Sequence, residues 1–66
     1  MTIYKVIDTN TDVSIYCKDS FTAFNTAAVM LYNKPSFRSS SLKSLIDTFS
    51  ENEEYGGIKI EEIYVI

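Results

Sequence analysis

The chain has 66 residues, of which 45% are hydrophobic, and a formal net charge of −3. This length allows a single domain, residues 1–66, and the apolar share is high enough for that domain to fold rather than stay disordered. The negative charge disfavours unspecific attraction to nucleic-acid backbones and to anionic membranes.

The inventory of reactive side chains argues against catalysis. The sequence has no histidine and a single cysteine, Cys17. Histidine is the commonest general base and the usual partner of a nucleophilic serine or cysteine, and zinc sites are built on histidine and cysteine clusters. Adjacent carboxylates such as Glu53–Glu54 and Glu61–Glu62 point in different directions and do not converge on one substrate. We therefore expect no enzyme, no cofactor and no bound metal.

The first third of the chain predicts a β-hairpin. Residues 3–7 are apolar on both faces, which is typical of a central strand. Residues 8–12 are rich in turn formers, and residues 13–17 then alternate, with Val13, Ile15 and Cys17 on one face. Cys17 is accordingly expected to be a small buried hydrophobe.

Two helices are predicted next. Asp19 or Ser20 is a candidate N-cap for a helix of about 13 residues, which ends near residues 33–35 because a proline follows. The serine-rich stretch 36–44 predicts a loop and the start of a second helix around residues 39–41. Each helix carries an apolar stripe that we expect to be buried. The stripes are Phe21, Phe24, Ala28 and Leu31, and Leu42, Leu45, Ile46 and Phe49.

The last strand is predicted over residues 58–66, after a turn at residues 55–57 in which glycine adopts positive φ. Its apolar pattern changes phase, so a β-bulge is expected at Glu61–Glu62. The bulge would place Ile63 and Val65 on the same face as Ile58 and Ile60, and would leave Tyr64 and Ile66 on the other.

These elements predict an α+β fold of order ββααβ. An antiparallel helix pair would make the last strand parallel to the first, giving a three-stranded mixed sheet of order 2-1-3 with two helices packed on one face. The order 1-2-3 is the alternative. Neither the element order nor the composition indicates a particular protein family.

Such a sheet leaves one face without a covering layer. If Val13, Ile15 and Cys17 meet the helices, Tyr16 faces outward, together with either Tyr4 and Val6 or Ile3 and Ile7. Tyrosines beside aliphatic side chains are typical of interaction surfaces. We therefore predict a small protein-binding module. Its anchors would be Tyr4, Tyr16, Tyr64 and Ile66.

Other contacts and partners stay open. The acidic C-terminal third offers a second contact surface for a basic partner, formed by Glu51, Glu53, Glu54, Glu61 and Glu62. A free edge strand also suits a homodimer. Single-stranded nucleic acid, bound by the tyrosines with help from Lys5, Lys18 and Lys59, is a less favoured alternative. A third alternative is an acidic mimic of nucleic acid.

Origin and location are expectations from composition. Residues with AT-rich codons are abundant, and small acidic proteins of this kind are common in bacteriophages. This favours a phage or mobile-element protein that modulates or inhibits a host protein. We see no signal peptide and no apolar run of membrane-spanning length, so the expected location is the cytoplasm, that of the host cell for a phage protein.

Overall fold

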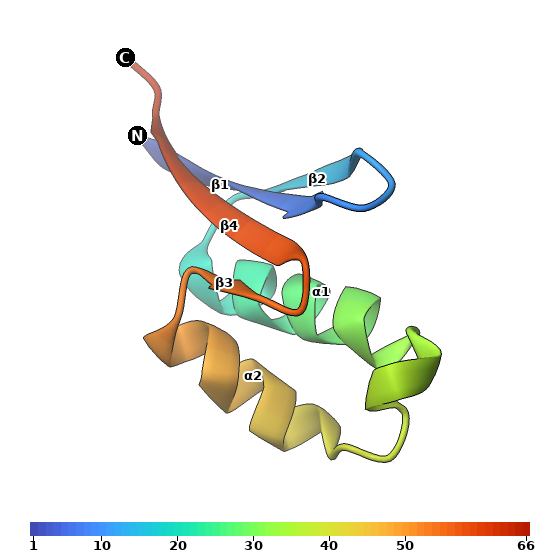
Figure 1. The fold of residues 1–66 in the computed structure, drawn as a ribbon. Coiled ribbons are helices and arrows are strands. Elements are labelled where there is room, and N and C mark those ends of the chain that lie inside the picture. The colour runs from blue at the N-terminus through green and yellow to red at the C-terminus, as the bar shows by residue number, and fades with distance from the viewer.

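The computed structural model describes all 66 residues. The elements in chain order are β1 (Thr2–Asp8), β2 (Val13–Cys17), α1 (Ser20–Tyr32), the 3-10 turn η1 (Pro35–Phe37), α2 (Leu42–Glu51), β3 (Glu54–Tyr55) and β4 (Ile58–Tyr64). They form one sheet of order β2-β1-β4-β3, with both helices on the same side of it (Figure 1). The α+β class is confirmed, but the sheet has four strands rather than three.

β1 lies at the centre of the sheet, between β2 and β4, as its two apolar faces predict. Val6 and Asp8 point toward the helices and are buried, whereas Ile3, Lys5 and Ile7 occupy the opposite face of the strand and are half-buried. Directly paired residues of a sheet lie on the same face, so the faces of β1 residues determine those of their partners in β2 and β4. The pairs of Val6 with Ile15 and with Ile60 lie on the helix side.

β4 runs antiparallel to β1, so the predicted parallel pairing is wrong. The two helices are antiparallel, as expected, and return the chain to the end of the sheet where β2 finished (Figure 1). The short strand β3 then crosses back along the sheet, and a turn at Gly56 and Gly57 reverses the chain into β4. Both glycines have positive φ, at 61° and 87°, as predicted for this turn. This extra hairpin accounts for the fourth strand and for the direction of β4.

No bulge interrupts β4, which also contradicts the prediction. Its register with β1 is continuous, from Ile58 opposite Asp8 to Tyr64 opposite Thr2. Simple alternation therefore places Ile63 away from the helices. There it lies opposite Ile3, an apolar partner that removes any need to shift the strand by one residue.

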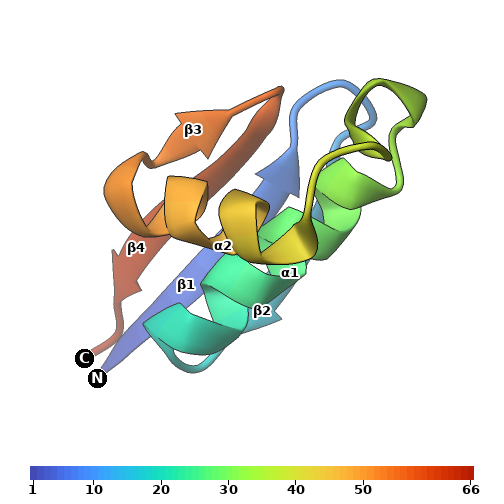
Figure 2. The same cartoon turned by 90° about the horizontal axis from the view of Figure 1, so that it is seen from below.

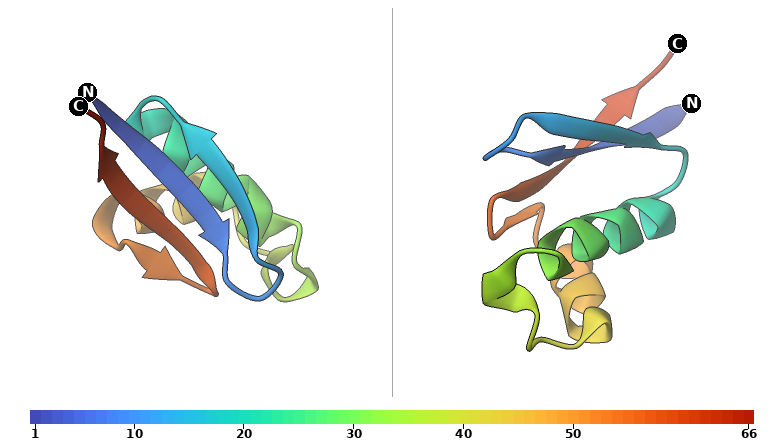
Figure 3. Two further views of the ribbon diagram at one scale, coloured as in Figure 1. Left: turned by 90° about the horizontal axis from the view of Figure 1, so that it is seen from above. Right: turned by 90° about the vertical axis from the view of Figure 1, so that its right-hand side faces the viewer.

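α1 has the predicted 13 residues and the predicted N-cap, because the Asp19 carboxylate accepts the Thr22 backbone N–H at 2.7 Å. Ala28 and Leu31 of the predicted stripe are buried and Phe24 packs against the core, but the stripe does not give the whole buried face. Phe21 is 69% exposed, whereas Ala23 and Ala27 are fully buried. α1 lies between the sheet and α2 (Figure 3), and alanines allow both layers to approach it closely.

α2 is capped by Ser41, whose hydroxyl accepts the Ser44 backbone N–H at 3.1 Å. Leu45 and Phe49 of the predicted stripe are buried and Ile46 packs against the core, but Leu42 at the start of the helix is exposed. The backbone of α2 comes close only to α1 and β3, so this helix lies over α1 and reaches the sheet at one edge.

The core is one cluster between the sheet and α1, closed at the side by α2. Its buried members are Val6, Cys17, Ala23, Ala27, Ala28, Leu31, Leu45, Phe49, Ile58 and Ile60. Cys17 is buried as predicted. Val13 and Ile15 share the helix side of β2 with Cys17, as predicted. They are exposed because they lie on the edge strand, where a shallow groove separates Ile15 from α1.

One partly buried ion pair ties the hairpin to the segment that follows α1. Asp8 accepts the Asn10 backbone N–H at 3.0 Å, and its carboxylate lies 3.2 Å from the Lys34 ammonium. Burial raises the pKa of this carboxyl, but the hydrogen bond from Asn10 and the interaction with Lys34 outweigh burial, and the net pKa lies below its ordinary value. The ion pair therefore favours the charged form in the folded protein.

Replacing Gly56 by alanine tests the turn that sets the direction of β4. A Cβ atom there would lie 2.6 Å from Leu31 Cδ1, and the positive φ is costly for any residue with a side chain. We expect Gly56→Ala to lower the free energy of unfolding by about 2 kcal/mol or more. Urea unfolding followed by circular dichroism measures this. Ser39→Ala, in an exposed loop, is the control, and equal midpoints for the two variants would contradict the assignment.

Acid unfolding tests the Asp8–Lys34 pair. A lowered pKa means that the folded state binds the proton less tightly than the unfolded chain, in which this carboxyl titrates near 3.8. The stabilisation is present above that pH and disappears as the pH falls through the folded-state pKa.

We expect Asp8→Asn to be less stable than the parent at about pH 7 and to lose less stability between about pH 7 and about pH 3. Asp47→Asn removes an exposed ion pair with Lys43 and should leave the stability at neutral pH nearly unchanged. An unaltered pH dependence in Asp8→Asn would show that the pair does not stabilise the fold.

Candidate functional site

The sheet face opposite the helices is covered by no other element of the chain (Figure 3). We call it the open face. Strand register assigns nine side chains to it: Ile3, Lys5, Ile7, Ser14, Tyr16, Glu54, Lys59, Glu61 and Ile63. Its apolar part consists of three half-buried isoleucines and one exposed tyrosine.

Tyr16 is the most prominent side chain of the open face. It is 62% exposed, and the Lys5 ammonium lies 5.9 Å from the centre of its ring. Ile3 and Ile63 face each other across β1 and β4 at one end of the face. These isoleucines are shielded only by their neighbours within the sheet, so a partner could still bury them further.

Charges on the open face are balanced. Lys5 of β1 lies directly opposite Glu61 of β4. Lys59 of β4 lies opposite Ile7 of β1 on one side and Glu54 of β3 on the other. Opposite charges on facing strands support the pairing of those strands. The open face therefore combines apolar surface with no excess of either charge.

The predicted tyrosine anchors do not share this face. Only Tyr16 lies on it. Tyr4 is half-buried on the helix side of β1, and Tyr64 lies on the helix side of β4, where it is 76% exposed. Ile66 follows the end of β4 and is fully exposed. The expected tyrosine cluster is thus corrected to one tyrosine on the edge strand, with Ile3 and Ile7 on the neighbouring strand and Ile63 beyond them.

Ile63 is the member of the open face that the sequence prediction missed. The bulge assumed at Glu61–Glu62 moved it to the helix side. Unbroken alternation of Lys59, Glu61 and Ile63 was the signal that could have placed it correctly.

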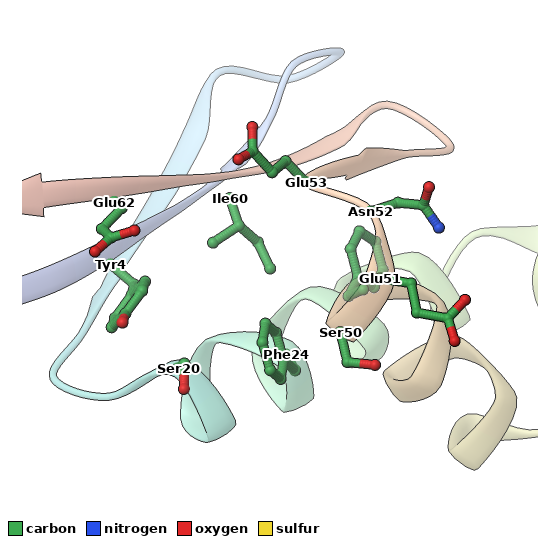
Figure 4. Close-up of a pocket in the computed structure, with 10 residues that line it drawn as sticks. Tyr4, Ser20, Phe24, Ser50, Glu51, Asn52, Glu53, Ile60 and Glu62 are labelled. Carbon is green, nitrogen blue, oxygen red and sulfur yellow. The ribbon is translucent and has the colours of Figure 1, made fainter.

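A second feature is a pocket of about 380 Å³ between the sheet and the helices (Figure 4). Its lining comes from β1, β4, both helices and the segment after α2. The residues are Tyr4, Ser20, Phe24, Phe49, Ser50, Glu51, Asn52, Glu53, Ile60 and Glu62. Tyr4, Phe24, Phe49 and Ile60 give it an apolar wall, and its volume lies in the range of small ligand sites.

The mouth of this pocket is acidic. Glu62 lies on the helix side of β4, whereas the Glu53 carboxylate points away from the helices (Figure 4), and no lysine or arginine lines the pocket. Neither carboxylate takes part in an ion pair, and Glu51 points outward from the end of α2 (Figure 4). No three metal-ligating side chains of the chain are grouped closely enough to hold a metal ion.

The predicted acidic contact residues are therefore divided between two surfaces. Glu51, Glu53 and Glu62 belong to the pocket, whereas Glu54 and Glu61 belong to the open face. Consecutive residues of a strand point to opposite faces, so Glu61 and Glu62 of β4 lie on opposite sides of the sheet.

Comparison of the chain with models of known protein families, with curated proteins and with solved structures gives no significant match. Neither helix has the length and apolar character that a membrane-crossing segment requires. The functional proposal below therefore starts from the two surfaces just described.

Proposed function

We propose that the chain is a small protein-binding module that acts by occupying a surface of a partner protein with its open face. The observation that carries this proposal is the uncovered apolar surface formed by Tyr16, Ile3, Ile7 and Ile63. Uncovered apolar surface on a small folded domain marks interaction sites, and tyrosine is enriched at their centres.

A binding role also fits the state of the one reactive side chain. The Cys17 thiol is buried in the core, and its Sγ lies 3.6 Å from the Thr26 hydroxyl oxygen. A thiol buried in this way contributes to the packing of the core and is not accessible to a substrate. A non-catalytic module is therefore the simpler proposal.

The charge pairs of the open face suit a partner with mixed rather than uniform charge. Alternating lysine and glutamate side chains add specificity and orientation more than raw affinity. A phage or mobile-element protein that modulates or inhibits a host protein is the biological setting we favour, because one small rigid face is sufficient to block a surface.

Truncation of the open face tests the proposal. We expect the double substitution of Tyr16→Ala and Ile63→Ala to weaken capture of the partner by at least about tenfold, because truncating central contacts of an interface typically costs about 2 kcal/mol. The assay is affinity capture from cells of the source organism, quantified by mass spectrometry.

Phe21→Ala is the matched control, since Phe21 is an exposed aromatic residue on α1 outside the open face. It should retain the partner. Equal retention by the double variant, with its circular dichroism spectrum unchanged, would remove the open face as the binding surface.

Single-stranded nucleic acid is a second candidate, favoured by one observation. Lys5 and Lys59 lie on the same face as Tyr16, an arrangement that combines stacking with phosphate contacts. Glu54 and Glu61 on that face oppose it, and a single aromatic ring offers one stacking platform. The split of the glutamates between two surfaces likewise weakens the idea of an acidic nucleic-acid mimic, which requires a dense array.

Fluorescence anisotropy with labelled single-stranded DNA and RNA at low salt separates the two candidates. We expect no change in anisotropy. Binding that weakens steeply with added salt would instead support the nucleic-acid function, because release of counterions is its signature.

A further inference from the structure

The outer edge of β4 is only partly covered. β3 pairs with Ile58 and Lys59, and Ile60 N–H donates to the Glu53 carbonyl at 2.8 Å. In an extended strand the backbone groups of alternate residues point the same way, so those of Glu62 and Tyr64 also point outward. No backbone hydrogen bond forms there, because β3 ends alongside the first part of β4 (Figure 2).

The acidic pocket lies directly beside this free edge. Ile60 and Glu62 of β4 line it from the sheet, and Tyr4 lines it from the neighbouring strand (Figure 4). A strand added next to β4 would place the side chain opposite Glu62 on the helix side, because directly paired residues share a face. That side chain would enter the pocket.

We propose that the edge of β4 at Glu62 and Tyr64 binds an extended, basic segment of a partner protein as an added strand, with an arginine or lysine side chain in the pocket. This site is distinct from the open face, and it rests on separate observations. Unpaired backbone groups supply main-chain affinity, whereas the pocket supplies selectivity.

Charge complementarity selects a cation as the occupant. Glu53 and Glu62 line the pocket and are free of intramolecular ion pairs, and the Glu62 carboxylate lies on its side of the sheet. The chain has a net charge of −3. The carbonyl end of α2 adds partial negative charge at Ser50 and Glu51. The start of α1 contributes the opposite partial charge, but the Asp19 carboxylate caps it.

The apolar wall suits the stem of a long cationic side chain. Tyr4 and Phe24 provide aromatic surface for the methylene groups, and a guanidinium can stack on such rings. The Tyr4 hydroxyl makes no hydrogen bond within the chain and lies in the pocket as a further polar contact. An arginine therefore finds both apolar and acidic partners in one place.

A second copy of this chain is a poor occupant of the same edge. Antiparallel pairing of two β4 edges about Glu62 would bring the two Glu62 carboxylates close together. Like charges that face each other across strands are destabilising. The acidic edge thus disfavours self-pairing while it attracts a basic strand.

The test uses a short peptide, acetyl-Val-Thr-Arg-Thr-Val-amide, titrated into the ¹⁵N-labelled protein. We expect chemical-shift changes at the amides of Glu62, Tyr64 and the pocket residues. A peptide with glutamate in place of arginine should bind at least about tenfold more weakly, and so should an analogue with alternate backbone nitrogens methylated.

Paired protein variants isolate the two carboxylates. Glu53→Gln with Glu62→Gln should weaken peptide binding by about fivefold, mainly through Glu62, since an exposed ion pair contributes at most about 1 kcal/mol. Glu54→Gln with Glu61→Gln removes the same charge from the adjacent residues on the open face and should change affinity by less than about twofold. Circular dichroism confirms that both variants fold.

Three results would overturn the inference: no shifts at the β4 edge, equal affinity for the arginine and glutamate peptides, or equal losses in the two double variants. Concentration-dependent shifts at Glu62 without peptide would assign the edge to a second copy instead. None of these outcomes bears on capture through Tyr16, so failure of this site and failure of the open-face proposal are distinguishable.

Discussion

The reversal at Gly56 and Gly57 is the constraint on which the rest of the structure depends. Two residues with positive φ, at 61° and 87°, turn the chain from β3 into β4 and make β4 antiparallel to β1. The turn is also packed from both sides, since a Cβ at Gly56 would meet Leu31 and one at Gly57 would meet Asn10. The faces on which the glutamates and isoleucines of β4 lie follow from this reversal.

The same reversal generates both candidate surfaces. Because β4 alternates without a bulge, it contributes Ile63 to the open face and Glu62 to the pocket. Because β3 has only two residues, it leaves the outer edge of the last part of β4 unpaired. One short hairpin therefore separates an apolar, charge-balanced face from an acidic edge on the other side of the same sheet.

Local signals in the sequence were sufficient for the elements but not for their relative directions. Asp19, Ser41 and Pro35 marked helix boundaries because capping and proline geometry act over a few residues. The direction of β4 depended on β3, whose residues Glu54 and Tyr55 carry no strand pattern and are held by pairing with β4. The prediction of a tyrosine face was wrong for the same reason. Strand register decides on which face Tyr4 and Tyr64 lie, and register is a property of the whole sheet.

The pairing of β1 with β4 joins the two ends of the chain. Thr2 lies opposite Tyr64, and the terminal ammonium of Met1 donates to the Val65 carbonyl at 2.9 Å. The pairing of β1 with β4 therefore closes a loop that contains nearly all of the remaining residues. Contacts between residues so far apart in the sequence raise the contact order, which slows folding. During synthesis β1 can pair with β2 early, but its second edge stays open until residues 58–64 have been made. A chain interrupted before that point would carry a central strand with one unpaired edge, which is a template for aggregation.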